Sequence, residues 1–160
     1  MPTVLVTAPT VEPVTLTEAK AQCRVEATVT DDDTYITSLI AAARDYAERI
    51  TNRVFITQTW DWKLDGFGGS TRQLWLPKPP LQSVTSVTYL DTAGVSQVLG
   101  TTLYSVDTAS QPGRIYPAYA QYWPSTYPVP LAVTVRFVAG FGLAAAVPQG
   151  LKDAMLKLIS

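Results

Sequence analysis

The apolar residues of this chain change their spacing twice, and this change constrains the fold more than any other feature. Over residues 31–53 they recur every three or four positions, which is the period of an amphipathic helix. In the strand-like runs of residues 54–140 the spacing falls to two, as in a β-strand with one buried face. Helical spacing returns after Pro148. The pattern predicts an α+β protein with a β-rich domain inserted into a small helical bundle.

The helical segments predict a bundle of two N-terminal helices and one C-terminal helix. Thr15 and Glu18 have the spacing of a capping box, which predicts a short helix to about Val25. Acidic residues open the helix at 31–53 and basic residues close it, as the helix dipole favours. We expect its apolar stripe to pack against the helix that begins at Pro148. The predicted core of the bundle comprises Ile36, Leu39, Ile40, Ala43, Tyr46, Leu151, Met155 and Leu158.

These patterns predict three parts of the chain. Residues 1–53 should form an extended N-terminal arm and the first two helices, residues 54–140 the inserted β domain, and residues 141–160 a helix that returns to the bundle. The apolar stripe of this last helix is still running at Ser160, without a capping residue. We therefore expect the sequence to be a clipped form of a longer protein.

The β region has several recognisable strands and turns. The segment from Val54 to Leu64 alternates apolar and polar residues, and Gln58 alone interrupts its apolar face. A slip in phase between Val84 and Val87 predicts a β-bulge. The prolines of residues 117–130 predict a long irregular loop, and residues 131–137 predict a last strand.

The composition excludes several classes of enzyme. The chain has no histidine, so the commonest general base and metal ligand is missing and a Ser–His or Cys–His triad cannot form. The single cysteine, Cys23, is interpreted as a small buried apolar residue. The glycines of residues 66–69 lack the lysine and helix of a phosphate-binding loop, and the acidic residues 31–33 fit a helix start better than a metal site. We expect no catalytic residue, no cofactor and no metal.

One enzymatic alternative stays open. A glycoside hydrolase needs only two carboxylates, and four aspartates of the β region can in principle meet in space: Asp61, Asp65, Asp91 and Asp107. Nothing in the sequence selects two of them.

The charge balance argues against tight binding of nucleic acid. Twelve basic and thirteen acidic residues give a net charge of −1, whereas proteins that neutralise phosphates usually have a basic excess. The densest basic group, Arg44, Arg49 and Arg53, is explained by the negative end of a helix dipole. No apolar run approaches the roughly 20 residues that cross a membrane, and no secretory signal is visible. The lone cysteine fits a cytoplasm.

The sequence also contains a proline-rich segment with many aromatic residues. Tyrosine and tryptophan are favoured at protein interfaces, because they are rigid and carry both apolar and polar surface. The segment therefore predicts either an interface or a loop that folds back over its own domain, and the sequence leaves both open. The candidate interface residues are Arg114, Tyr116, Tyr119, Tyr122, Trp123 and Tyr127.

Several short segments, in their order along the chain, resemble one protein family. They are residues 12–20 (EPVTLTEAK), 39–44 (LIAAAR), 57–60 (TQTW), 76–84 (LPKPPLQSV), 113–115 (GRI) and 135–142 (VRFVAGFG). This order is similar to that of the head–tail connector (adaptor) proteins of long-tailed bacteriophages and prophages, some of which are labelled putative DNA-packaging proteins. The resemblance spans nearly the whole chain.

The resemblance implies a structural role in the virion neck. Family members form a ring, typically of twelve copies, below the portal protein, where the ring extends the DNA channel and carries the next head-completion (stopper) or tail protein. DNA would pass through this channel without specific binding, and the protein would be made in the cytoplasm of the bacterial host. Relatives continue past the C-terminal helix with a tail that reaches the portal. The alternatives are another ring-forming neck or tail-completion protein and a virion-associated glycan hydrolase.

Overall fold

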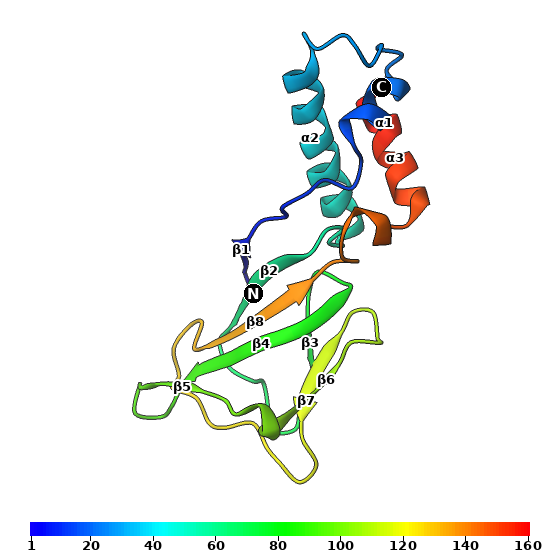
Figure 1. Ribbon diagram of the computed structural model, residues 1–160. Helices are drawn as coiled ribbons and strands as arrows, with labels where there is room; N and C mark the ends of the chain where they lie inside the picture. The colour runs from blue at the N-terminus through cyan, green and yellow to red at the C-terminus, as the bar shows by residue number, and fades with distance from the viewer. The chain divides into compact units, whose positions relative to one another are not determined.

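The computed structural model describes all 160 residues, which form two compact units. The helical unit consists of residues 9–57 and 141–160, and the β unit of residues 1–8 and 58–140 (Figure 1). The predicted α+β class, with strands inserted between the second and third helices, is confirmed. The structure differs for residues 1–8, which we had grouped as an arm with the first two helices, because they belong to the β unit and include its strand β1.

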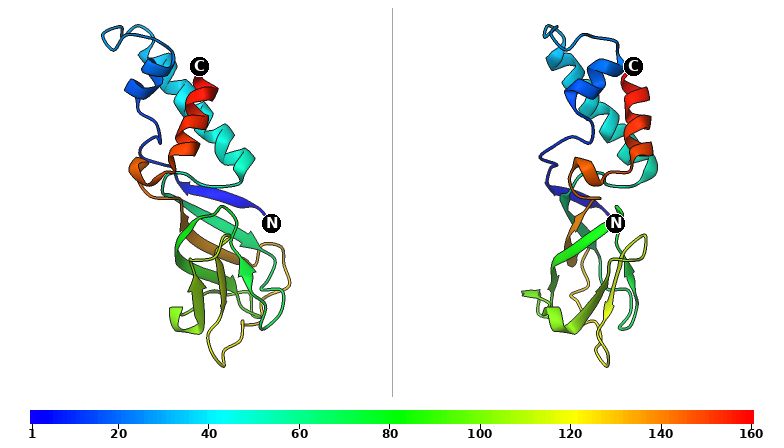
Figure 2. Two further views of the ribbon diagram at one scale, coloured as in Figure 1. Left: turned by 90° about the vertical axis from the view of Figure 1, so that its right-hand side faces the viewer. Right: turned by 45° about the vertical axis from the view of Figure 1, so that its right-hand side comes forward.

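The helical unit contains three helices: α1 (Leu16–Gln22), α2 (Asp33–Thr51) and α3 (Gln149–Ile159). A short 3₁₀ turn, η2 (Ala144–Ala146), precedes α3. Each of the three helices contacts the other two (Figure 2). None of them combines the length and apolarity needed to cross a membrane.

The start of α1 has the predicted capping box. The Thr15 hydroxyl accepts a hydrogen bond from the Glu18 N–H at 3.2 Å, and the Glu18 carboxylate accepts one from the Thr15 N–H at 2.7 Å. The helix ends at Gln22, before the expected Val25. Its buried Lys20 forms an ion pair with Asp33, so this aspartate joins the first turn of α2 to α1.

The core of the helical unit lies between α2 and α3 and includes α1. Ile36, Ile40 and Ala43 of α2 and Met155 of α3 are buried in it, and Leu39 and Leu151 pack against it half-buried. Phe55 and Ile56, which follow α2, are fully buried in the same cluster. The core also includes Val14, Ala19, Val147 and Ile159.

Two residues predicted for this core lie at the surface. Tyr46 is 52 % exposed and Leu158 is 49 % exposed. On a helix of 3.6 residues per turn, Tyr46 lies about 90° from the middle of the stripe of Ile36, Ile40 and Ala43, on the side of Tyr35. The buried stripe of α2 is that of Ile36, Ile40 and Ala43. The placement of Tyr46 and Leu158 in the core was therefore wrong.

The C-terminal end of α2 is held by a buried carboxylate. Glu48 accepts hydrogen bonds from the Phe55 N–H at 2.7 Å and from Arg44 at 3.3 Å. Arg44 in turn donates from Nε to Glu12 at 2.8 Å. Arg44 is therefore part of an ion-pair network rather than only a partner of the helix dipole. Asn52 ends the helix in the left-handed conformation, with φ of 50°.

The β unit is built on a five-stranded antiparallel sheet in the order β1-β2-β8-β4-β5, in which β8 lies between β2 and β4 (Figure 1). Its strands are β1 (Thr3–Thr7), β2 (Gln58–Leu64), β8 (Val133–Ala139), β4 (Leu81–Leu90) and β5 (Ser96–Val98). The strand predicted from Val54 begins only at Gln58, because residues 54–56 are buried consecutively and do not alternate.

The middle of this sheet follows the predicted alternation closely. Val133, Val135 and Phe137 of β8 are completely buried on one face. The bulge predicted near Val84 and Val87 is confirmed, since the register between β4 and β8 shifts between Val84 and Ser86. A second shift lies between Leu81 and Ser83.

A second, three-stranded sheet has the order β3-β7-β6. It comprises β3 (Leu74–Trp75), β7 (Arg114–Pro117) and β6 (Tyr104–Asp107), and the 3₁₀ turn η1 (Thr101–Leu103) precedes β6. Sequence reasoning missed β7, which has four residues and ends in a proline. Gly113, just before it, is required by space, because a Cβ there would lie 2.5 Å from the Leu81 Cβ.

The turn between β6 and β7 is organised by one carboxylate. Asp107 accepts hydrogen bonds from the Ser110 hydroxyl at 2.7 Å and the Ser110 N–H at 3.1 Å. It also accepts one from Arg114 Nε at 2.8 Å. These donors, the Ser110 hydroxyl first, lower the pKa of Asp107 from 3.8 to about 2.

The first prediction concerns the packing of α2. Replacing the buried Ile40 by alanine removes apolar contacts to α3 and leaves a cavity, which should lower the free energy of unfolding by about 2–5 kcal/mol. Replacing the exposed Ser38, two residues away on α2, by alanine should change it by less than about 0.5 kcal/mol. Urea unfolding followed by helical circular dichroism measures both. Equal values for the two variants would contradict the core described here.

The second prediction concerns the pH dependence of the β6–β7 turn. Because folding lowers the pKa of Asp107 to about 2, its ionised form stabilises the protein fully above the unfolded pKa near 3.9. This contribution is lost as the pH falls through the folded pKa. The variant Asp107→Asn should therefore be less stable than the original at pH 7, and the difference should disappear near pH 2 in urea-unfolding series. A difference that vanishes already above pH 4 would contradict the network.

Candidate interaction surfaces

The aromatic segment of residues 114–127 consists of a strand followed by a loop. It begins as β7 and continues as a loop, in which Tyr119 is 99 % exposed and Tyr122 is 67 % exposed. Tyr116 and Tyr127 are partly exposed. Four of the predicted interface residues thus present aromatic surface to solvent, which is unusual without a partner to cover it.

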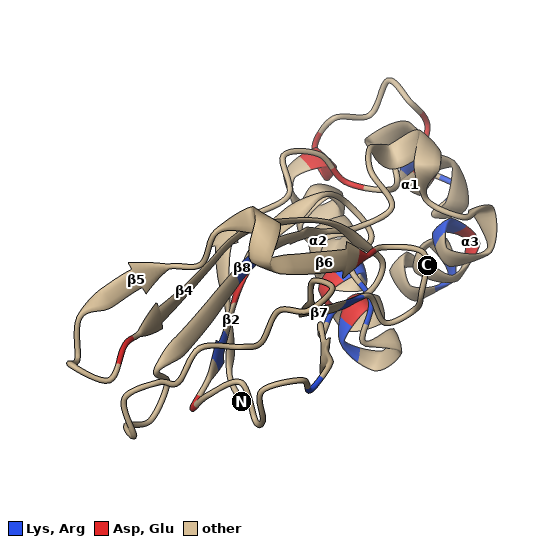
Figure 3. Ribbon diagram, turned by 90° about the horizontal axis from the view of Figure 1, so that it is seen from below, with Lys and Arg blue, Asp and Glu red and all other residues tan.

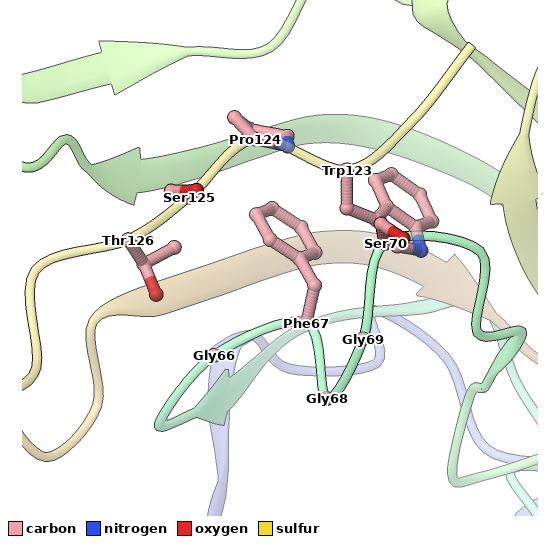
Figure 4. A pocket seen from close by; sticks show the side chains of 9 residues that line it. All are labelled: Gly66, Phe67, Gly68, Gly69, Ser70, Trp123, Pro124, Ser125 and Thr126. Carbon is pink, nitrogen blue, oxygen red and sulfur yellow. The ribbon is translucent and has the colours of Figure 1, made fainter.

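Trp123 belongs to the interior of the β unit and corrects part of the predicted interface. It is 5 % exposed, and its ring stacks on Phe67 with the ring centroids 4.7 Å apart (Figure 4). The indole N–H donates to the Arg72 carbonyl at 2.6 Å. Its own backbone N–H donates to the Ser70 carbonyl at 2.8 Å. At this residue the segment folds back onto its own unit, because the indole finds both an apolar and a polar partner there.

The stack of Trp123 and Phe67 lies at an open pocket between two loops. Residues 66–70 line one side and residues 123–126 the other, around a volume of about 320 Å³ (Figure 4). The pocket contains no acidic or basic side chain. Its lining offers hydroxyl and backbone groups, so it has no group suited to acid–base chemistry.

Arg114 is also engaged within the β unit. Besides its bond to Asp107, it donates to Gln73 at 3.0 Å and lies over the Trp75 ring, with its guanidinium carbon 5.1 Å from the ring centroid. Its side chain is therefore held by three partners and shapes the surface beside Tyr116. Its predicted role at an interface stays a prediction.

The four aspartates considered for a glycoside hydrolase each have a structural partner. Asp61 forms a two-pronged ion pair with Arg136 at 2.8 and 2.9 Å, and Asp65 accepts from the Leu131 N–H at 2.9 Å. Asp91 accepts from backbone N–H groups of its own turn, and Asp107 was described above.

The pKa values of these carboxylates point away from acid catalysis. The Arg136 hydrogen bond lowers the pKa of Asp61, and the Gln97 hydrogen bond lowers that of Asp91. A general acid in a glycosidase needs a raised pKa, so that it carries a proton near neutral pH. The hydrogen bonds of Asp61, Asp91 and Asp107 instead lower the pKa of each carboxyl group.

The acidic residues 31–33 and Cys23, which the sequence did not assign to a site, have local surroundings in the helical unit. Asp32 precedes α2 and Asp33 pairs with Lys20. No group of three or more histidine, cysteine, aspartate or glutamate side chains is placed to hold a metal ion. Cys23 is partly buried against the helical core, with its sulfur 3.8 Å from the Ile159 carbonyl oxygen.

Sequence reasoning missed two exposed apolar surfaces. The first borders the buried stripe of α2, where Tyr35, Tyr46 and Ile50 are all more than half exposed. The second is β1, an edge strand whose Val4 and Leu5 are exposed although the strand has no charged residue. The β-branched residues and prolines at the start of the sequence had predicted only an extended arm, since a sequence does not show which strand lies at the edge of a sheet.

Comparison with known proteins identifies relatives for this arrangement. The profile of the Phage gp6-like head-tail connector protein family matches residues 13–96. None of the curated proteins matches the sequence.

Three solved structures share the fold over nearly the whole chain. A chain in the neck of an empty gene transfer agent (GTA) particle, computed with C6 symmetry, is 25 % identical with a TM-score of 0.80, over 99 % of this chain and 82 % of that one. A chain of the native GTA virion is 22 % identical with a TM-score of 0.79, over the same shares of the two chains. A chain in the neck of the native particle, computed with C12 symmetry, is 24 % identical with a TM-score of 0.72, over 99 % and 81 %.

The matched residues 13–96 contain helices α1 and α2 and strands β2, β3 and β4. Because the profile covers more than half of the sequence, the chain belongs to the Phage gp6-like head-tail connector protein family and is a structural protein that connects head and tail.

Proposed function

We propose that this chain is one subunit of a closed ring of twelve copies between the portal and the next head-completion or tail protein. The observation that carries the proposal is the fold shared over 99 % of the chain with a neck protein of a particle computed with C6 symmetry. A related neck computed with C12 symmetry supports twelve copies. A ring of identical copies needs two different complementary surfaces on each copy.

The charge distribution supports a role around a passage for DNA. The β unit carries five basic and four acidic residues, and the helical unit seven and nine. Both signs are interspersed along the ribbon (Figure 3). Without a strongly basic surface the ring would not hold phosphates tightly, so DNA can slide through.

In this proposal the exposed tyrosines bind a neighbouring neck protein. Tyr119 and Tyr122 project from a loop whose other end is fixed by the buried Trp123. A fixed loop loses little conformational entropy on binding, and tyrosines bury large area at low cost. The pairing of every candidate aspartate with a structural partner supports a protein without a catalytic role.

The third prediction tests the ring. We expect the isolated protein to be mostly monomeric and to form rings on portal particles, because rings formed in advance would compete with ordered assembly. Light scattering of the protein alone and electron microscopy of portal particles with and without it measure this. Portal particles that carry no ring would contradict the proposed function. Rings formed equally well without portal would contradict only the templating.

The fourth prediction tests the tyrosine loop. The double variant Tyr119→Ser, Tyr122→Ser should keep its stability, because both side chains are exposed. Its affinity for the portal or for the next neck protein should fall about tenfold to a hundredfold, as interface tyrosines contribute 1 kcal/mol or more each. Co-sedimentation with each purified partner decides which one is contacted.

A matched control comes from the helical unit. The variant Tyr35→Ser removes a tyrosine of similar exposure, 65 % against 67 % for Tyr122. It should leave the binding of that partner unchanged. Unchanged binding by the loop variant to both partners would remove the tyrosine loop from the interface.

A further inference from the structure

The five-stranded sheet of the β unit has two free edges, and neither edge strand carries a charged residue. β1 is one edge and β5 the other. Exposed edge strands normally carry charged residues, since unpaired N–H and C=O groups otherwise recruit further strands. Neither β1 (TVLVT) nor β5 (SQV) contains a charge, and Leu5 and Val98 are 44 % and 72 % exposed.

The unpaired backbone groups of β1 follow from its register. The Lys63 N–H donates to the Pro2 carbonyl at 3.0 Å, so the next residue of β1 that faces β2 is Val4. In an antiparallel ladder the intervening residues face the other way. Thr3 and Leu5 therefore direct their N–H and C=O groups outward from the sheet.

The unpaired groups of β5 follow in the same way. The Leu99 N–H donates to the Val87 carbonyl at 2.8 Å, so Gln97 is the residue of β5 that faces β4. Ser96 and Val98 then direct their groups outward. Each edge thus offers a short row of outward donors and acceptors at alternate residues.

We propose that β1 of one copy pairs with β5 of the next copy, so that the sheets of all subunits join into one continuous belt around the ring. This inference deepens the proposed ring and rests on it. Neighbouring strands of the sheet are all antiparallel, so β1 and β5 point the same way, and a head-to-tail rotation that keeps this direction makes the new pair parallel. The Leu5 N–H then donates to the Ser96 carbonyl of the next copy, and the Val98 N–H of that copy donates to the Leu5 carbonyl.

A second copy fits these edges for three reasons. The two edges are different and lie on opposite sides of one sheet, which is what a head-to-tail ring requires. Both are uncharged, so neither brings a buried charge into the contact. Five strands about 4.8 Å apart give each copy a width of about 24 Å, so twelve copies close a belt about 90 Å across, before any tilt of the strands.

Cysteine cross-linking tests the pairing in assembled rings. With Cys23 replaced by alanine, the variant Leu5→Cys, Gln97→Cys places two thiols on strands that would be adjacent only between copies. A short thiol-reactive cross-linker, added to portal particles with bound rings, should produce a ladder of covalent oligomers on a denaturing gel. The control Leu5→Cys alone, which has no thiol on β5, should give no ladder.

A second variant tests the hydrogen bonds themselves. Leu5→Pro removes an N–H that faces outward, so it should leave the stability of the isolated protein within about 0.5 kcal/mol, because proline is tolerated at a sheet edge. It should reduce ring formation on portal particles at least tenfold. Rings that form normally with this proline, or rings without a cross-linked ladder, overturn the edge pairing and leave the proposed function intact. Portal particles without rings for the original protein overturn both.

Discussion

The buried carboxylate of Glu48 holds together the region on which the rest of the chain depends. It sits at the end of α2, accepts hydrogen bonds from the Phe55 N–H and from Arg44, and through Arg44 reaches Glu12, which precedes α1. Burial lowers the pKa of Arg44, but its bonds and charge interactions with Glu12 and Glu48 raise it by more, so the guanidinium stays charged. A buried carboxylate left without these donors would cost several kcal/mol. The network therefore fixes the direction in which the chain leaves α2, and it keeps Phe55 in the core.

The sequence predicted the regular parts of the fold because periodicity and capping act locally. Thr15 and Glu18 cap α1 through bonds within one turn, and the stripe of Ile36 and Ile40 needs only helical spacing. Periodicity does not show how much of a helix surface the neighbouring helices cover. For this reason Tyr46 was placed in the core although it is exposed. It also cannot show long-range strand pairing. β1 was interpreted as an arm because its pairing with β2 joins residues more than fifty positions apart.

The candidate site could be predicted as a segment but not residue by residue. The density of tyrosines in 114–127 indicated aromatic surface, and four of them are at least partly exposed. Trp123 has the same local sequence character, yet it is buried because Phe67 and the Arg72 carbonyl lie beside it in space. The aspartates likewise looked equivalent in sequence. Their roles were decided by distant donors, such as Arg136 for Asp61 and the Leu131 N–H for Asp65.

The short free edges of the β unit explain how a subunit can pair with other copies in an assembly and still exist as a monomer. Pro2 and Pro9 bracket β1 and limit it to five residues, and β5 has only three. Short edges and flanking prolines are devices by which proteins limit uncontrolled strand pairing. One contact between two such edges contributes few hydrogen bonds and does not outweigh the entropy lost by two free molecules. On a surface that already holds the copies side by side, that entropy has been lost beforehand, and the same weak contact forms at a high effective concentration. A short, uncharged edge therefore favours pairing in the ring over pairing in solution.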